Sequence, residues 1–362
     1  MAEPLKNYYS RDYINTLSKA LKRVETGFDS ARFRKRIFSD SWDDKELKAR
    51  MQHIARTLHH FLPQDYSKAI GILSQVVELL PRDKNSGYLG MYFPEFVSFY
   101  GRDDWETSLP ALGWFTRFAS SEFAVRPFIL DDPPRMMTQM HEWAQNADEH
   151  LRRLASEGCR PRLPWAMALP LFKQDPRPVL KLLEGLKEDK SRYVQKSVAN
   201  NLNDISKDNP ELVLKTTKRW QGRSPETDWI LKQACRTLLK QSHPEALKLF
   251  GLQSQVDRLK NFTVNQPMLK LGEELEFSVS FHVKQKCVLR VEYLIDYLKK
   301  NGTHSTKVFQ WAEREFEKGT HDLSSKQRFE QFTTRKHYSG AHRIRVRING
   351  REFKPVEFEL QI

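Results

Sequence analysis

Residues 191–210, SRYVQKSVANNLNDISKDNP, decide the fold of the first two thirds of the chain. The apolar residues of this stretch lie three or four positions apart, at Val194, Val198, Leu202 and Ile205. Charged and amide side chains occupy the positions between them. A period of 3.6 residues puts the apolar side chains on one face of an α-helix. The stretch therefore predicts an amphipathic helix that ends shortly before its last proline.

A proline recurs around this helix every 34 residues, at Pro176, Pro210 and Pro244. Proline suits the first turn of a helix, because the N–H that it lacks has no partner there. Further amphipathic runs occupy residues 43–62, 65–80, 104–119, 147–158, 177–187, 210–220, 226–241 and 244–250. Helical pairs that recur with this period predict an α-solenoid, in which each pair packs only against its neighbours.

After about residue 255 the apolar period changes to two. Leu275, Phe277 and Val279 begin one alternating run, and two further runs cover residues 289–297 and 356–362. Alternation of this kind indicates half-buried β-strands. Asn349-Gly350 predicts a two-residue hairpin turn. The predicted architecture is an all-α solenoid over residues 1–255 followed by an all-β, immunoglobulin-like sandwich over residues 256–362.

Charge is distributed unevenly along the 362 residues, whose net charge is +14. Residues 91–150 carry −6, whereas residues 151–240 carry +9. Such a basic segment predicts that one face meets a polyanion. Three cysteines without a CxxC pair argue against a disulfide framework and fit a reducing cytoplasm. No signal peptide or membrane-spanning apolar run is found, so the sequence predicts neither a secreted nor a membrane protein.

The segment ASEGCRPRLPW, residues 155–165, is the most unusual in the chain. Its two prolines stiffen a stretch that carries Arg160, Arg162 and Trp165. Two guanidinium groups and an indole in one stiff loop can bind phosphates and stack on a base or sugar. The alternative is an ordinary connection between helices, with Trp165 folded into the core.

Basic residues recur on the polar faces of the predicted repeats. If those faces line a concave wall, the basic residues would bind the DNA backbone. They are Arg153, Arg192, Lys196, Lys232 and Arg236. In the last third of the chain three arginines alternate with apolar residues and so leave one face of a strand, at Arg343, Arg345 and Arg347. Solvated faces are the alternative in both cases.

Three carboxylates, Glu122, Glu157 and Asp204, are placed among these cations. A carboxylate that faces DNA repels phosphate and weakens binding, so its presence needs another reason. Each of the three is therefore a candidate for catalysis. The alternatives are ordinary helical pairs of Glu122 with Arg126 and of Glu157 with Arg153, or a favourable interaction with a helix dipole. The histidines form no cluster with metal-ligand spacing, and no nucleotide-binding motif is present. We therefore expect neither a metal nor a cofactor.

The segments SEFAVRPF (121–128), LRRLASEGCRPRLPW (151–165) and SRYVQKSVANNLNDISKDNP (191–210) resemble the AlkC family of bacterial DNA alkylation-repair glycosylases. The resemblance covers most of residues 1–255. It implies a solenoid of HEAT-like repeats, to which many members add an immunoglobulin-like domain. By motif position, the family's carboxylates fall on Glu122, Glu157 and Asp204 and its aromatic residue on Trp165.

This resemblance also implies an activity. The protein is expected to excise N3-methyladenine and N3-methylcytosine from double-stranded DNA, as a monomer, without strand cleavage and without pulling the base into a deep pocket. A rival hypothesis is a non-catalytic solenoid that only binds bent or damaged DNA. A protein-binding scaffold is less favoured, because it has no need of the charge excess in residues 151–240.

Overall fold

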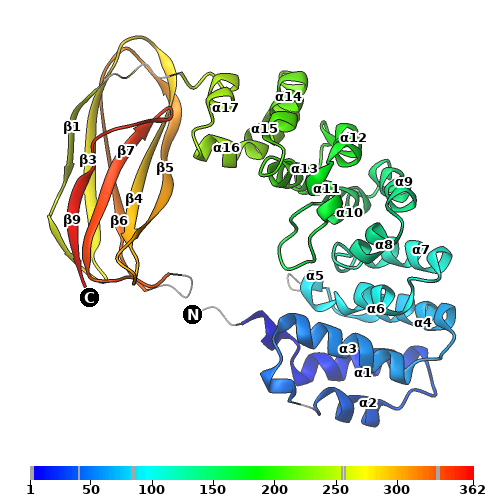
Figure 1. The fold of residues 1–362 in the computed structure, drawn as a ribbon. Coiled ribbons are helices and arrows are strands. Elements are labelled where there is room, and N and C mark those ends of the chain that lie inside the picture. The colour runs from blue at the N-terminus through cyan, green and yellow to red at the C-terminus, as the bar shows by residue number, and fades with distance from the viewer. Residues whose placement is uncertain (1–3, 40, 83–85, 254–255, 257, 332–334) are drawn as a thin grey trace. The chain divides into compact units, whose positions relative to one another are not determined.

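The structure is a computed structural model that describes residues 4–39, 41–82, 86–253, 256, 258–331 and 335–362. It divides into two compact units, Met1–Ala234 and Cys235–Ile362 (Figure 1). The first unit is helical, and the second combines two short helices with a β-sandwich. A helical array followed by a sandwich is therefore confirmed.

Helices of the first unit are joined by short turns. Its 3₁₀ helices are η1 (Leu5–Tyr8) and η2 (Trp42–Asp44). Its α-helices are α1 (Arg11–Val24), α2 (Ser30–Ile37), α3 (Leu47–Phe61), α4 (Tyr66–Leu79), α5 (Ser86–Leu89), α6 (Tyr92–Tyr100), α7 (Trp105–Phe115), α8 (Val125–Asp131), α9 (Pro133–Ala144), α10 (Glu149–Gly158), α11 (Pro170–Gln174), α12 (Arg177–Leu186), α13 (Arg192–Ile205), α14 (Pro210–Trp220) and α15 (Pro225–Ala234).

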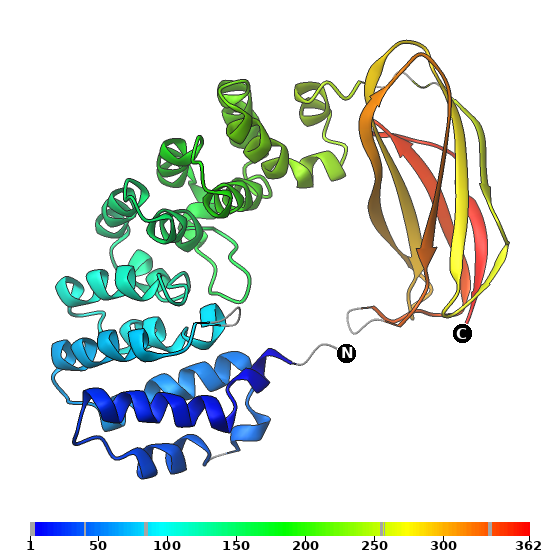
Figure 2. The same cartoon turned by 180° about the vertical axis from the view of Figure 1, so that it is seen from behind.

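These helices form two rows within the unit. In one row, α3 packs on α6, and α13 packs between α10 and α15. In the other row, α4 packs between α1 and α7, and α9 packs on α12. Figures 1 and 2 show α10 and α13 on the inner side of the curved unit and α9 and α12 on its outer side. The inner row therefore offers a wall on which polar side chains from successive repeats can meet.

The proline period marks helix starts, as predicted. Pro176 is the N-cap residue of α12, and Pro210 is the first residue of α14. Pro244 begins α17 (Pro244–Leu249), which lies in the second unit with α16 (Arg236–Lys240). The sequence places the change of period near residue 255, whereas the compact units divide before α16. The last proline of the series thus begins a helix that packs with the sandwich unit.

The second unit is built mainly from two sheets. Its strands are β1 (Leu259–Val264), β2 (Met268–Lys270), β3 (Glu274–Val283), β4 (Cys287–Leu298), β5 (His304–Phe316), β6 (Gly319–Arg328), β7 (Gly340–Ile348), β8 (Arg351–Glu352) and β9 (Val356–Gln361). One sheet has the order β1-β3-β6; the other has the order β2-β9-β7-β4-β5, with β8 beside β7. Asn349 and Gly350 have φ angles of 45° and 82° and join β7 to β8, which confirms the predicted two-residue turn.

Strand β4 differs from the expected half-buried pattern. Alternate residues face the core as predicted, but Arg290, Glu292 and Asp296 on its other face are also buried. Ion pairs explain their burial, because Glu292 accepts from both Arg290 and Arg347 at 2.8 Å. Arg347 also donates to the carbonyl oxygen of Lys240 at the end of α16, so the short helices are hydrogen-bonded to this sheet.

No helix in the described ranges is both long enough and apolar enough to cross a membrane. Among the same residues, histidine, cysteine and carboxylate side chains do not gather in threes as they would around a metal ion.

Candidate functional site

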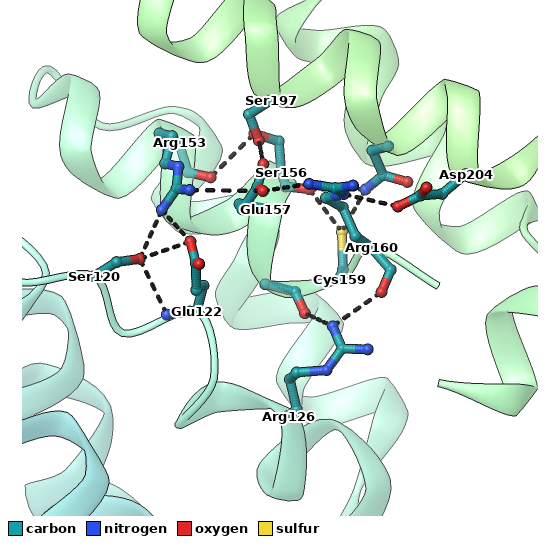
Figure 3. A network of polar contacts seen from close by, with 12 residues as sticks. Ser120, Glu122, Arg126, Arg153, Ser156, Glu157, Cys159, Arg160, Ser197 and Asp204 are labelled. Atoms are coloured by element: carbon teal, nitrogen blue, oxygen red, sulfur yellow. Dashed lines mark hydrogen bonds and ion pairs between the residues drawn. The ribbon is translucent and has the colours of Figure 1, made fainter. Parts of the chain in front are cut away.

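Three segments of the helical unit bring the predicted carboxylates together (Figure 3). Glu122 lies in the turn that leads into α8, Glu157 in the last turn of α10, and Asp204 in the last turn of α13. Helix α10 packs directly on α13, which puts their polar C-terminal ends side by side. Residues separated by more than 80 positions in the sequence thus form one cluster, which we call the carboxylate cluster: Glu122, Glu157 and Asp204.

Two arginines alternate with the members of the carboxylate cluster (Figure 3). The Arg153 guanidinium pairs with Glu122 and also lies 3.6 Å from Oε1 of Glu157. Arg160 binds the same Oε1 at 2.5 Å through Nη1, and its Nε donates to Oδ2 of Asp204 at 2.8 Å. Negative and positive groups therefore follow one another in a row, in which each arginine holds two carboxylates in a fixed relation.

The two ends of this row differ. Asp204 accepts a second ion pair from Lys207 at 3.0 Å, so both of its oxygens have a cationic partner. On Glu122, Oε2 accepts from Ser120 at 2.9 Å and pairs with Arg153. Asp204 is thus enclosed by cations, whereas Glu122 lines an open cleft, as does Glu157.

A chain of hydroxyl groups fixes Glu157 from behind. Ser197 on α13 donates to Oε2 of Glu157 at 2.7 Å, and Ser156 donates to Ser197 at 2.7 Å. Asn201, one turn further along α13, donates to the carbonyl oxygen of Ser156 at 2.7 Å. These side chains are buried, so their hydrogen bonds hold the C-terminal turn of α10 against α13.

Burial and charge act in opposite directions on the two arginines. Burial lowers the pKa of Arg153, but the Glu122 and Glu157 carboxylates outweigh this effect and raise its pKa above the ordinary value. Burial also lowers the pKa of Arg160, but the Glu157 and Asp204 carboxylates raise it by more, so its pKa lies above the ordinary value. Both guanidinium groups therefore stay charged and keep the carboxylates electrostatically balanced.

Arg126 has a different role from the one its spacing suggests. Its side chain is fully buried, and its hydrogen bonds go to the carbonyl oxygens of Gly158, Arg160 and Met167 at 2.7–2.9 Å. Burial lowers the pKa of this guanidinium to about 10. The predicted alternative of a helical pair between Arg126 and Glu122 is wrong, because Arg126 points at the loop after α10 and braces it.

Trp165 lies in that loop and is not part of the core. Its relative exposure is 67%, which rules out the alternative that it is folded inside. Its φ angle of +64° is in the left-handed region, which a tryptophan rarely adopts. Lys48 on α3 donates to its carbonyl oxygen at 3.1 Å. The loop thus presents the indole to solvent in a strained backbone conformation.

The exposed indole and the carboxylate cluster share a cleft of about 500 Å³. Glu122, Glu157 and Arg160 form its polar wall, and Trp165 with Pro164 forms part of its apolar wall. The remaining lining comes from the residue after η1, from α3 and its N-cap, from α5, from the segments before α6 and α8, and from the loop after α10: Tyr9, Glu46, Leu47, Lys48, Met51, Tyr88, Met91, Phe123 and Leu163. A cleft that combines ion-paired carboxylates with an exposed aromatic ring can accept a sugar or base and stabilise positive charge on it.

The other predicted DNA-binding residues of the helices have partners or surroundings of their own. Arg162 pairs with Asp208 at 2.5 Å. Arg192 stacks on Trp229, with 3.2 Å between its guanidinium carbon and the ring centroid, and Lys196 on the same helix is exposed. Lys232 is half-buried on α15, while Arg236 is exposed on α16 and belongs to the second unit. Contact of these cations with DNA stays a prediction.

The arginines of β7 leave one face of the strand, as predicted. That face also carries carboxylates, so Arg343 pairs with Glu357 at 2.8 Å and Arg345 with Glu352 at 2.8 Å. Arg347 is only 4% exposed. Buried ion pairs already occupy its guanidinium, so a contact of Arg347 with phosphate requires these pairs to open and stays a prediction. The exposed Arg343 keeps its predicted role as a proposal.

Sequence reasoning missed several residues that build the site. Lys48, Ser197 and Asn201 were not singled out, and Arg126 was seen only as a partner for Glu122. One signal was present on α13, since Ser197, Asn201 and Asp204 follow one another at intervals of four and three residues. Such a polar stripe predicts a shared face, but the sequence alone does not tell whether that face meets water or another helix.

Family models match most of the two units. A model described as "DNA alkylation repair enzyme" matches residues 111–238 and so includes the whole carboxylate cluster. Residues 258–362 match a model described as "Uncharacterised protein YhaZ, C-terminal Ig-like domain". The chain is 42% identical to the uncharacterized protein YhaZ of Bacillus subtilis (strain 168), over 98% of this chain and 99% of that protein.

A solved structure matches the whole chain. It is the alkylpurine DNA glycosylase AlkC of Pseudomonas fluorescens, bound to DNA that contains an abasic site analog. The match has a TM-score of 0.95 and 36% sequence identity, and it covers 99% of this chain and 100% of that one. With the family models and the YhaZ match, this likeness extends over both units. The chain therefore belongs to the AlkC family of DNA alkylation-repair enzymes.

Proposed function

We propose that the protein is a monofunctional DNA glycosylase that hydrolyses the N-glycosidic bond of cationic N3-methylated bases in duplex DNA. The observation that carries the proposal is the carboxylate cluster, held by Arg153 and Arg160 beside a cleft with an exposed indole. The similarity to AlkC of Pseudomonas fluorescens, an alkylpurine DNA glycosylase whose structure was solved on DNA with an abasic site analog, supports the same reaction.

The chemistry fits the residue types. N3-methylation gives the base a positive charge, so the base departs as a neutral molecule with the electron pair of its bond to C1′. The sugar then carries positive charge, which a carboxylate near C1′ stabilises. A water molecule attacks C1′ and gives its proton to a carboxylate, which leaves a free base and an abasic site. No general acid is needed for the leaving group, because the charged base departs as a neutral molecule.

The members of the cluster are not equivalent in this scheme. Glu122 and Glu157 line the cleft, whereas both oxygens of Asp204 bind cations. We therefore assign the stabilisation of C1′ and the activation of water to Glu122 and Glu157. Trp165 lines the same cleft and faces the cationic base or its sugar there, where a cation–π interaction contributes about 0.5–2 kcal/mol. The reaction then needs no deep base pocket, and the damaged base stays in the helical stack.

The test is to incubate purified protein with methylated duplex DNA and identify the released bases by chromatography and mass spectrometry. We expect release of N3-methyladenine and N3-methylcytosine and the appearance of alkali-labile abasic sites, with no direct strand cleavage. Glu122→Gln should lower the single-turnover rate by about 10²–10⁴-fold and change the DNA dissociation constant by less than about threefold.

Two outcomes would contradict this proposal. Salt-sensitive DNA binding with no released base would favour a non-catalytic protein that recognises bent or damaged DNA. Equal losses of rate and affinity in Glu122→Gln would make Glu122 a residue that positions the DNA and not a catalytic one.

A further inference from the structure

Helices outside the matched repair domain supply one wall of the cleft. The repair-enzyme model begins at residue 111, yet α3 and its N-cap contribute Glu46, Leu47, Lys48 and Met51 to the lining. Figure 1 shows α3 in the first third of the unit and the loop between α10 and α11 in the last third. The hydrogen bond from Lys48 to the Trp165 carbonyl joins residues 117 positions apart.

Lys48 lies where three groups can hold its ammonium. It donates to the Trp165 carbonyl oxygen at 3.1 Å and lies 5.6 Å from the centroid of the Phe123 ring. It also lines a second cavity of about 220 Å³ together with Glu95 on α6, a buried carboxylate that accepts from Gln52 at 2.8 Å. Lys48 and Phe123 line both cavities and so separate them.

The loop that carries Trp165 is thereby anchored at two places. Arg126 binds the carbonyl oxygens of residues 158, 160 and 167, on either side of the left-handed turn, and Lys48 binds the carbonyl at the turn itself. A left-handed tryptophan is costly and persists only where its surroundings impose it. Among the described contacts, the hydrogen bond from Lys48 is the only one that joins the N-terminal helices to the backbone of Trp165, so removing Lys48 removes this link.

We propose that Lys48 is a positioning residue, which holds Trp165 in its left-handed conformation so that the indole lines the same cleft as Glu122 and Glu157. This role rests on the proposed glycosylase function. Lys48 acts through Trp165 and does not itself contact the reacting sugar. The N-terminal helices therefore contribute to excision although the repair-enzyme model does not include them.

Two measurements test the proposal with Lys48→Met. The first is hydrogen–deuterium exchange of the 159–169 amides in the free protein, which should become faster, because Lys48 no longer holds the turn. The second is a double-mutant cycle on the single-turnover excision rate. We expect Lys48→Met to lower the rate about fivefold in the wild-type background and less than twofold in Trp165→Ala, with an unchanged DNA dissociation constant.

Lys48→Arg, which retains a donor, should recover most of the rate. Lys68→Met is a matched control, since Lys68 is an exposed lysine on α4 that pairs with Asp65, and it should leave both measurements unchanged. An equal loss of rate in both backgrounds, together with weaker DNA binding, would overturn the proposal and identify Lys48 as a direct phosphate contact.

The two proposals can fail separately. If the wild-type protein releases no base, the proposed glycosylase function fails, and the exchange measurement still decides whether Lys48 holds the loop. Unchanged exchange in Lys48→Met would reject the positioning role whatever the activity.

Discussion

Asp204 is held by two cations that come from different parts of the chain. Lys207 lies three residues further along, and Arg160 comes from a loop 44 positions earlier. Its side chain is 2% exposed. Burial arises here because α13 packs on α10, and a tertiary contact of this kind leaves no periodic trace in the sequence.

The role of Asp204 can be separated from that of Glu122 by substitution. We expect Asp204→Asn to lower the single-turnover rate about 100-fold and to change DNA affinity by less than about threefold, since Arg160 would lose one of its two carboxylates. It should also lower the free energy of unfolding by about 1.5–3 kcal/mol, because a buried charged hydrogen bond is lost. Urea titration and single-turnover kinetics measure the two effects. A wild-type rate in Asp204→Asn would remove Asp204 from the mechanism.

Ser197 tests the hydroxyl chain behind Glu157. Ser197→Ala removes the donor to Oε2 of Glu157 and the acceptor that Ser156 has on α13, which leaves Ser156 the backbone carbonyl oxygen of Arg153 at 3.1 Å. We expect the free energy of unfolding to fall by about 1–2 kcal/mol, and the excision rate to fall with it because the Glu157 carboxylate is freer to rotate. Ser197→Thr, which keeps a hydroxyl group, is the control. A rate unaffected by Ser197→Ala would show that Arg153 and Arg160 alone fix Glu157.

At the scale of elements, many amphipathic helices and strands were predicted. Helix α12 (Arg177–Leu186) lies within the predicted run 177–187, and β3 (Glu274–Val283) within one residue of the predicted strand. Helices α1 and α9 were missed although each buries one face. Other elements were missed for a physical reason. Helix α6 is buried almost all round, which removes its polar stripe, and β6 carries mostly polar side chains, which removes the apolar half of the alternation.

Helices α16 and α17 belong with the sandwich and should contribute to its stability. Arg347 donates to the carbonyl of Lys240, and Asn349 donates to that of Gln253. We therefore expect a fragment of residues 235–362 to unfold at a higher temperature than a fragment of residues 256–362, by roughly 5 °C or more for each kcal/mol that the helices add. Circular dichroism follows both transitions. Identical midpoints would show that the sandwich does not depend on these helices.

The core of the sandwich contains two histidines whose titration should make it sensitive to acid. His337 and His342 are 3% and 0% exposed, near Tyr297 and Phe329. Burial lowers the pKa of both rings below their ordinary value of 6.5. The unfolded chain therefore binds more protons than the folded one below about pH 6.5, and the free energy of unfolding falls as the pH drops towards the lowered pKa values. Arg335, close to His337, adds to this effect.

Urea unfolding at pH 7.5 and pH 5.5 measures this dependence. The wild-type sandwich should lose stability between the two conditions, and a variant with His337→Gln and His342→Gln should lose less. Other ionisable groups titrate in both proteins. The difference between the two losses of stability therefore reports on the two histidines. Equal losses in both proteins would assign the acid sensitivity to groups elsewhere in the chain.

For the whole molecule, the number of basic residues overstates the number of cations that are available to DNA. The segment 151–240 contains 19 lysines and arginines, yet many of its arginines are already paired within the protein. Arg152 binds Asp189 at 2.7 Å, and Arg219 binds Glu184 at 2.5 Å. The sequence therefore predicts a polyanion as partner, but the number of phosphate contacts depends on which pairs survive in the folded chain.

That number can be measured from the salt dependence of DNA binding. Ten basic residues were predicted to bind DNA, and three of them, Arg153, Arg160 and Arg347, are buried in ion pairs. If the remaining seven each neutralise one phosphate, log K should fall with log salt with a slope of about −6, whereas ten contacts would give about −9. Fluorescence anisotropy with a duplex that carries an abasic site analog, between about 50 and 200 mM NaCl, distinguishes these values. A slope near −9 would mean that the buried pairs open on binding, so that Arg153 and Arg160 release their carboxylates when DNA arrives. A slope near zero would instead show that these basic residues do not bind DNA phosphates, and it would favour a protein-binding scaffold.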